Sequence, residues 1–248
     1  MRIDHLSYSS LNSWESNPFQ WFLERILNVR STTTPQQQVG TDFHEHVQHR
    51  LDEHRPPNDS DDARHIYHSI YAVPFELLKK GGRCEVEIKT QIEGVPFHGY
   101  VDYLVDDFVL DWKVNGYMRE ATTSPKPGYE IIYPKKFAQK RWQELRHLEA
   151  INDERGTQLG LYQVALGIGD SVAGVDQIVG PKTRLRVAQY RKPISRYHKQ
   201  GAVQRLKRCW DYVSRGHYFC DLTERQSADR AESLKAGYAN PEWSDLLA

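Results

Sequence analysis

Two aspartates and a lysine near the middle of the chain form the pattern with the clearest chemical meaning. Asp102 ends a Gly-x-x-Asp segment that begins at Gly99, and Asp111 and Lys113 follow on either side of Trp112. Carboxylate oxygens are ligands for Mg²⁺, which fills its remaining positions with water and substrate oxygens. A lysine beside such a metal can orient the attacking water or neutralise charge on phosphorus. Asp-x-Lys alone is also common on the solvated faces of short strands, so its position after Gly-x-x-Asp is what favours metal-dependent hydrolysis of a phosphodiester.

Alternating apolar and polar residues predict three antiparallel strands that position these side chains. The predicted strands span residues 84–91, 97–105 and 108–114. Neighbouring strands can bring Asp102 and Asp111 together on the sheet. The two-residue period places Lys113 on the face of Asp111, whereas Trp112 points to the opposite face, into the core. The backbone carbonyl of Trp112 is then available as a further metal ligand.

Helices are predicted on both sides of these strands. The first covers residues 7–30 and is divided near Pro18, because proline interrupts a helix. After a polar connector over 31–38, a second helix opens at Gly40-Thr41. Apolar residues recur on it every four positions, which marks a buried stripe formed by Phe43, Val47 and Leu51.

The remaining segments complete an α/β pattern. Further helices are predicted at residues 62–80, 136–150, 158–168 and 200–215, and a further strand at 183–190. We therefore predict one domain over residues 1–248, with a central mixed sheet flanked by helices. An irregular and helical insertion is expected at about residues 115–155, where Gly, Pro, Thr and Tyr are frequent.

Composition excludes several classes of protein. The 248 residues include three widely spaced cysteines and no Cys-x-x-Cys pair, which argues against a disulfide framework or a zinc ribbon. No stretch approaches the roughly 20 apolar residues that span a bilayer, so no membrane partner is expected. A reducing cytoplasm, in a bacterium or a phage-infected cell, is the simplest setting.

Five short segments with candidate functional residues occur in a fixed order: residues 6–19, Gly40–His44, Gly99–Asp102, Asp111–Lys113 and Gln158–Tyr162. This ordered set resembles the PD-(D/E)XK nuclease superfamily, and within it the RecB-like exonuclease branch. The resemblance spans about residues 6–216, apart from the insertion, and it implies a restriction-endonuclease-like core. Each motif is short, so the order of all five carries the resemblance.

The resemblance implies a role for each matching residue. His44, Asp102 and Asp111 would be metal ligands, together with the backbone carbonyl of Trp112, and Lys113 would be catalytic alongside the two aspartates. The metal would be Mg²⁺ or Mn²⁺, since a histidine ligand makes Mn²⁺ as plausible as Mg²⁺.

Four other residues have less direct roles in this interpretation. Gln158 and Tyr162, one helical turn apart, would contact the DNA backbone or a metal-bound water. Glu85 or Glu87, on the strand before the Gly-x-x-Asp segment, could add an outer carboxylate.

The charge distribution agrees with a nucleic-acid substrate, although the net charge is zero. Residues 181–210 contain ten Lys and Arg and no Asp or Glu. Within this basic stripe Arg184 and Arg186 alternate on the predicted strand, which fits a groove that follows a DNA backbone. A solvated basic surface explains the same run equally well.

Some relatives carry an iron–sulfur cluster held by four cysteines. Here Asn17 occupies the first of those positions, and only Cys209 and Cys220 lie late in the chain, so no cluster is expected.

The function expected from the sequence is metal-dependent cleavage of DNA from its ends, in recombination, repair or phage DNA processing. The partners would be linear DNA and a separate recombination or helicase protein. Two alternatives stay open: a structure-selective endonuclease with the same metal site, and a DNA-binding assembly protein whose nuclease site is vestigial.

Overall fold

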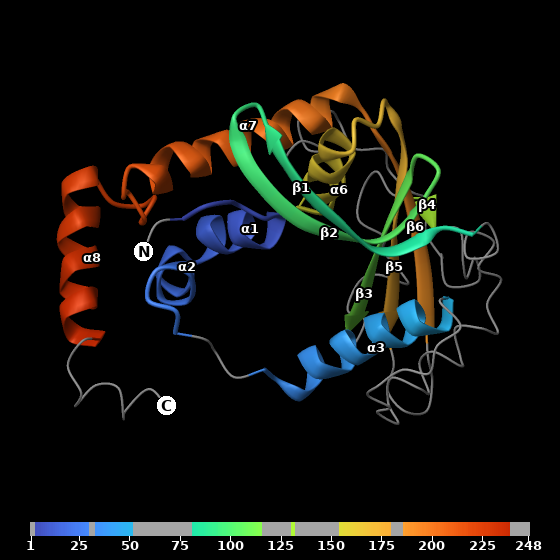
Figure 1. Ribbon diagram of the computed structural model, residues 1–248, viewed down its shortest axis with the longest axis horizontal. Helices are drawn as coiled ribbons and strands as arrows, with labels where there is room; N and C mark the ends of the chain where they lie inside the picture. Colours follow the sequence, from blue (N-terminus) through green and yellow to red (C-terminus); the bar gives the residue numbers. More distant parts are fainter. Residues whose placement is uncertain are drawn as a thin grey trace. The chain divides into compact units, whose positions relative to one another are not determined.

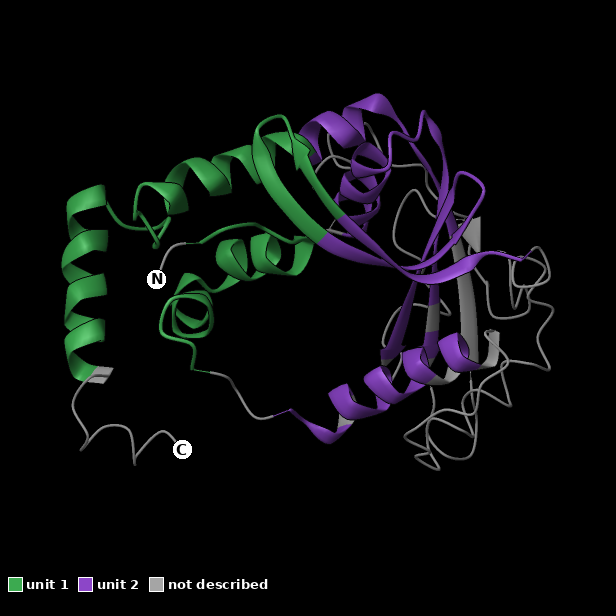
Figure 2. Ribbon diagram, viewed as in Figure 1, with its two compact units in different colours: residues 1–32, 89–98, 203–248 green, residues 33–88, 99–202 purple. Residues whose placement is uncertain are grey.

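The computed structural model describes residues 3–29, 33–51, 81–115, 130–131, 154–179 and 186–238. The predicted helices at 62–80 and 136–150, most of the insertion at 115–155, and Arg184 lie outside these residues. The chain divides into two compact units, one formed by residues 1–32, 89–98 and 203–248, the other by 33–88 and 99–202 (Figure 2). The prediction of a single domain over 1–248 therefore stays a prediction.

A six-stranded mixed sheet forms the centre of the fold, in the order β1-β2-β3-β5-β6-β4 (Figure 1). Its strands are β1 (Arg83–Ile92), β2 (Val95–Val105), β3 (Phe108–Asn115), β4 (Glu130–Ile131), β5 (Ser171–Val179) and β6 (Arg186–Ile194). Strand β3 pairs antiparallel with β2 and parallel with β5, while β6 pairs antiparallel with both of its neighbours. The predicted α/β class and the three-stranded meander are confirmed.

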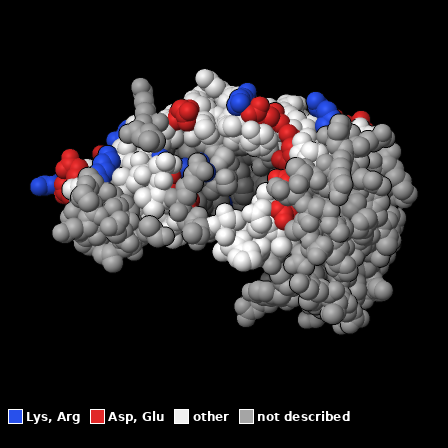
Figure 3. Space-filling model, turned by 60° about the horizontal axis from the view of Figure 1, so that its bottom comes forward, with Lys and Arg blue, Asp and Glu red and all other residues white. Residues whose placement is uncertain are grey.

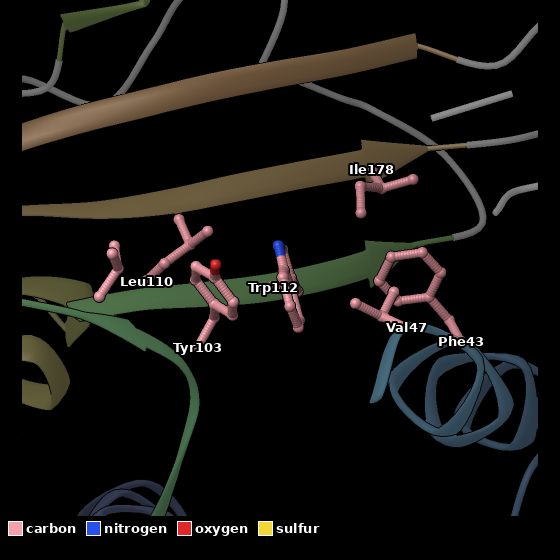
Figure 4. Close-up of a cluster of buried hydrophobic side chains, with 7 residues drawn as sticks. Phe43, Val47, Tyr103, Leu110, Trp112 and Ile178 are labelled. Carbon is pink, nitrogen blue, oxygen red and sulfur yellow. The ribbon is translucent and has the colours of Figure 1, made fainter. Parts of the chain in front are cut away.

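Helix α3 (Pro35–Leu51) covers one face of this sheet with an apolar stripe. Phe43 and Val47 pack with Tyr103, Leu110 and Trp112, and this cluster is buried (Figure 4). Trp112 is only 3% exposed, so the prediction that it points into the core is confirmed. Because side chains alternate along β3, its neighbours in the sequence, including Asp111, point to the other face.

Helix α3 begins earlier than the sequence pattern predicted. Residues 35–38 were expected in a polar connector, but they form its first turn. Thr34 and Gln37 make reciprocal contacts: Gln37 N–H donates to Thr34 Oγ1 at 3.2 Å, and Thr34 N–H donates to Gln37 Oε1 at 2.8 Å. This capping box satisfies two backbone N–H groups, and Pro35 suits the first helical position. Gly40 therefore lies inside the helix, not at its start.

The division of the first helix at Pro18 is confirmed. Helix α1 (Tyr8–Ser16) ends before Asn17, whose side chain caps α2 (Pro18–Arg25) by accepting from Gln20 N–H at 3.1 Å. Aromatic side chains fill the core of this unit, and the indole of Trp14 donates to the carbonyl of Tyr218 at 2.9 Å.

Strand β5 was not predicted from the sequence, although it lies at the centre of the sheet. It contains a buried aspartate, Asp176, which is paired with Arg191 of β6 at 2.8 Å. The Arg191 guanidinium also lies 5.3 Å from the centre of the Phe108 ring. A side-chain Cβ at Gly174 would come within 2.7 Å of Arg191 Nη1, so glycine leaves the space that this buried arginine occupies.

Two helices complete the C-terminal part of the described chain. Helix α7 (Arg196–Ser214) starts four residues before the predicted helix, and α8 (Glu224–Tyr238) was not predicted. Thr223 and Gln226 form a capping box at the start of α8, with hydrogen bonds of 3.1 and 3.3 Å between them.

The basic stripe of residues 181–210 is broken up by internal contacts. Arg191, Lys192 and Lys199 are buried, while Arg205 pairs with Glu15 and Lys207 lies 2.9 Å from Glu93. On the face in Figure 3 the described Lys and Arg side chains form separate spots and no continuous band. Much of the basic run is therefore engaged within the protein. Arg186 lies in β6, but its side chain is not described.

No helix in the described part of the chain is both long enough and apolar enough to span a lipid bilayer.

Candidate metal centre

Three side chains from different elements converge beside the middle of β3. His44 of α3, Glu85 of β1 and Asp102 of β2 each offer a ligand atom, and these atoms lie within 4.8 Å of one another. His44 Nδ1 lies 3.1 Å from Glu85 Oε1 and 3.8 Å from Asp102 Oδ1. Because α3 packs its apolar stripe on Trp112, the neighbouring His44 is held at the edge of this core, 6.0 Å from the indole between ring centres.

Glu85 lies at an irregular point in the backbone of β1. Its φ angle is +48°, a conformation that is uncommon for a residue with a side chain and interrupts the regular strand. Such strained residues persist where surrounding contacts hold them, and they concentrate at functional sites. At this irregular position of β1, the Glu85 side chain is hydrogen-bonded to His44 of the cluster.

Asp102 lies where the ladder between β2 and β3 ends. The paired register runs from Val105–Phe108 to Tyr103–Leu110, and Asp102 and Asp111 are the next residues on the two strands. Instead of a further backbone partner, Trp112 N–H donates to Asp102 Oδ2 at 2.6 Å. The carboxylate is thereby fixed beside β3.

Asp111 is almost completely buried and is held from two sides. Lys113 Nζ donates to its Oδ1 at 2.9 Å, and Gln158 Nε2 of α6 (Glu154–Ala165) donates to the same oxygen at 2.7 Å. Lys113 Nζ also lies 2.9 Å from Oδ2, so the ammonium forms an ion pair with both carboxylate oxygens. Oδ2 is buried and accepts no hydrogen bond from the described residues.

The clustered charges shift the pKa values of their neighbours. Burial, and next the charge of Asp111, raise the pKa of Asp102 to about 7, although His44, Lys113 and the Trp112 N–H oppose the shift. Burial alone would lower the pKa of His44, but its hydrogen bond to Glu85 and the charges of the surrounding carboxylates outweigh burial and raise it.

Lys113 stays protonated for a similar reason. Burial would lower its pKa, yet the charges of Asp111 and Asp102 raise it overall. Burial and the charge of Asp111 likewise raise the pKa of Tyr162, which therefore keeps its hydroxyl proton. At neutral pH Lys113 is a positive charge and a hydrogen-bond donor, not a base.

The donor set fits a divalent cation. Three carboxylates, Glu85, Asp102 and Asp111, face one lysine and one histidine, and buried charges that are not neutralised are costly. Oxygen ligands suit Mg²⁺ and Mn²⁺, and the imidazole of His44 suits Mn²⁺ well. A bound cation would lower the raised pKa of Asp102 and would give the buried Asp111 Oδ2 a ligand in place of a missing hydrogen bond.

The structure brings most of the sequence-predicted site residues together. His44 and Asp102 lie in one group, and Asp111 and Lys113 are close enough to Asp102 for their charges to shift its pKa. Glu85, expected only as an outer carboxylate, contacts His44 directly.

The two helix α6 residues lie beside Asp111, near the proposed metal centre. Gln158 and Tyr162 are buried, and Gln158 contacts both Asp111 and the Tyr162 hydroxyl, the latter at 3.3 Å. Their expected contact with DNA, like the roles of the Trp112 carbonyl, Arg184 and Arg186, stays a prediction.

Comparison with known proteins agrees with this geometry. Residues 5–76 match the family model of the PD-(D/E)XK nuclease superfamily. The predicted resemblance to this superfamily is confirmed. The matched residues include His44 but end before Glu85, Asp102 and Asp111. No curated protein matches the chain.

A solved structure also resembles the whole fold. It is a "Putative exonuclease" from Eubacterium rectale, 12% identical, with a TM-score of 0.53 over 89% of this chain and 86% of that one. At this identity the likeness establishes the fold alone. It supports the restriction-endonuclease-like architecture predicted from the motifs.

Proposed function

We propose that this protein is a RecB-like nuclease that hydrolyses DNA phosphodiesters with a divalent metal, working from DNA ends. The observation that carries the proposal is the convergence of His44, Glu85 and Asp102 beside a buried Asp111 oxygen without a hydrogen bond. The superfamily match at residues 5–76 supports a nuclease, and the name of the structural neighbour supports the exonucleolytic mode.

His44, Asp102 and Asp111 would hold Mg²⁺ or Mn²⁺, with Glu85 and the carbonyl of Trp112 as further ligands. A bound cation of this kind polarises a phosphoryl oxygen and lowers the pKa of a bound water. Lys113, which keeps its proton, donates toward the reacting phosphate and neutralises charge that develops there. Gln158 fixes one Asp111 oxygen, so that the other can face a ligand.

Linear DNA with accessible ends is the proposed substrate. A recombination or helicase protein as a partner also remains part of the proposal, because the sequence contains no helicase motif. The intact set of His44, Asp102, Asp111 and Lys113 favours an active enzyme over a vestigial site.

The deciding experiment compares end-labelled linear DNA with covalently closed circular DNA, each with Mg²⁺ or Mn²⁺. An exonuclease degrades the linear substrate and leaves the circle intact, because a circle has no end. Cleavage of the circle identifies an endonuclease. Absence of metal-dependent cleavage of either substrate, or full activity in Asp111→Asn, contradicts the proposal.

A further inference from the structure

Arg155 is a cationic residue in the first turn of α6 that the proposed reaction does not use. It lies three residues before Gln158, the donor to Asp111, and residues three apart lie on the same face of a helix. Its side chain is half-buried, so part of it is accessible from solvent. The direction in which α6 crosses the sheet decides what lies next to this residue.

Two contacts fix the direction of α6 relative to β3. Gln158 contacts Asp111, in the middle of β3. Five residues later along the helix, Gln163 donates to Ser171 Oγ at 2.8 Å, and this hydroxyl donates to the carbonyl of Asp107, just before β3, at 3.4 Å. Later residues of the helix therefore lie beside earlier residues of the strand, so α6 runs antiparallel to β3.

This direction places Arg155 beside Lys113. Arg155 lies about 4.5 Å along the helix axis from Gln158, toward the end of β3, and Lys113 lies two residues after Asp111 in the same direction. An electrostatic effect agrees with the placement. Burial and the positive charge of Arg155 would lower the pKa of Lys113, although the charges of the nearby aspartates outweigh them. Two cations thus lie near each other at the side of the proposed metal centre.

The chemistry of the two cations indicates what they bind. Lys113 is paired with Asp111 and, in the proposed reaction, faces the phosphate that is cleaved. A guanidinium has five N–H donors in a planar fork that matches two phosphate oxygens, so Arg155 can bind a phosphate and keep another contact at the same time. A DNA strand that places one phosphate at the metal brings the next phosphate close to it. A second cation beyond Lys113 suits that next phosphate.

We propose that Arg155 is a substrate-binding residue that holds the DNA phosphate next to the one being cleaved. In linear DNA this neighbour is either an internal phosphodiester or the phosphate at the end of the strand, and both present anionic oxygens to the guanidinium. The inference rests on the proposed nuclease function, because that function places the cleaved phosphate at the metal centre.

Binding measured without hydrolysis tests the inference separately from activity. Fluorescence anisotropy with a labelled linear oligonucleotide, and Ca²⁺ in place of Mg²⁺, gives the affinity at several salt concentrations. Arg155→Gln should weaken binding by roughly 10-fold and should reduce the slope of log affinity against log salt by about one. Arg155→Lys keeps the charge and should keep the slope.

Arg196→Gln is the matched control. Arg196 is exposed and follows β6, whose last residue pairs with Ser171, so it lies near the opposite end of α6 from Arg155. This variant should keep the wild-type affinity and salt slope. An unchanged slope in Arg155→Gln, or an equal reduction in Arg196→Gln, would overturn the inference.

Neutral methylphosphonates that replace single phosphates of the DNA locate the contact. At one position the wild type should lose affinity by roughly 10-fold, whereas Arg155→Gln should show no further loss there. Oligonucleotides with and without a terminal phosphate form a separate arm, which assigns the contact to the strand end or to an internal diester. Losses of equal size in both proteins at every position, the terminal one included, would contradict a role for Arg155.

Cleavage kinetics distinguish this inference from the proposed function. Arg155→Gln should raise KM and leave kcat within about 3-fold, because the contact holds the substrate equally before and during the reaction. A wild type that cleaves DNA, combined with an unchanged salt slope in Arg155→Gln, refutes only the role of Arg155. DNA binding that depends on Arg155 in a protein that cleaves nothing refutes only the proposed hydrolysis.

Discussion

Asp111 of β3 and Asp176 of β5 are both buried aspartates in neighbouring strands, but their surroundings differ. Asp176 pairs with Arg191, whose guanidinium packs against Phe108, so its charge is balanced inside the protein. Asp111 also has a cationic neighbour, Lys113, but that lysine is partly exposed and faces a second carboxylate, Asp102, as well. One Asp111 oxygen accepts no hydrogen bond from the described residues. The first aspartate has the environment of a structural residue, and the second that of a ligand for an external cation.

Asp111→Asn should have the largest effect on the cleavage rate and only a small effect on stability. Asp111→Asn removes a proposed metal ligand, and the loss of several kcal/mol of charge stabilisation should lower the cleavage rate on the order of 10³-fold or more. The same change relieves repulsion with Asp102 but removes the ion pair with Lys113, whose side chain is 40% exposed. These two effects oppose each other, so the free energy of unfolding without metal should change by no more than about 1 kcal/mol. Cleavage kinetics and urea unfolding measure the two quantities.

Asp176→Asn should give the opposite result. It removes the negative charge that lies opposite the buried Arg191, and breaking a buried ion pair costs about 3–5 kcal/mol of unfolding free energy. The cleavage rate of the folded fraction should be unchanged, since Asp176 is on the opposite face of the sheet from Asp111. If both variants lose the same property, the contrast between the two aspartates is wrong.

Lys113→Met tests the proposed role of the lysine as a fixed charge. Removing a donor aimed at the developing charge should lower the cleavage rate by roughly 10²–10³-fold. Metal binding should persist, because Lys113 is not a ligand. Full activity in this variant, or loss of metal binding, contradicts the assigned role.

Gln158→Leu tests whether positioning Asp111 matters. Residues that orient metal ligands typically contribute about 10–100-fold to metal affinity or activity. Gln163→Leu is a control on the same helix, because Gln163 is also buried but donates to Ser171 at 2.8 Å, away from Asp111. This control should keep the wild-type cleavage rate. Equal effects of the two substitutions would assign Gln158 a merely structural role.

The smallest expected effect is a pH dependence set by Asp102. Its pKa is raised to about 7, so it must lose a proton before it can bind metal, and metal affinity should fall by about tenfold per pH unit below 7. The raised pKa of His44 acts in the same direction.

The metal-free protein should show the complementary trend in stability. Because the folded protein binds this proton more tightly than the unfolded chain, stability should rise as pH falls from 8 to 6, by up to about 1.4 kcal/mol per unit. Asp102→Asn should show a weaker dependence in urea unfolding. A wild-type stability that rises toward pH 8 would contradict the assigned pKa.

Local patterns were sufficient to predict the meander and the residues on it. The two-residue period placed Asp111 and Lys113 on one face and Trp112 in the core, as found. The start of α3 could have been predicted as well, because Thr34 and Gln37 have the spacing of a capping box. Gly40-Thr41 instead predicts a later start, yet Gly40 lies inside the helix.

Other features depend on contacts between distant residues and could not be predicted from local patterns. The positive φ of Glu85 has no sequence signal, since the residue lies in an otherwise regular alternating strand. In the sequence, Arg191 is one residue of a basic run. Its partner Asp176 lies on β5, a strand that contains Gly174 and that was not predicted. The contact between Gln158 and Asp111 joins residues 47 positions apart.

Calorimetric titration of Mn²⁺ into the metal-free protein tests the central claim most directly. The wild type and Asp176→Asn should show saturable binding, whereas His44→Ala, Glu85→Gln, Asp102→Asn and Asp111→Asn should each weaken it by at least roughly 10-fold. Absence of binding by the wild type, or equal binding by all of the variants, would contradict the assignment of this cluster as the metal centre.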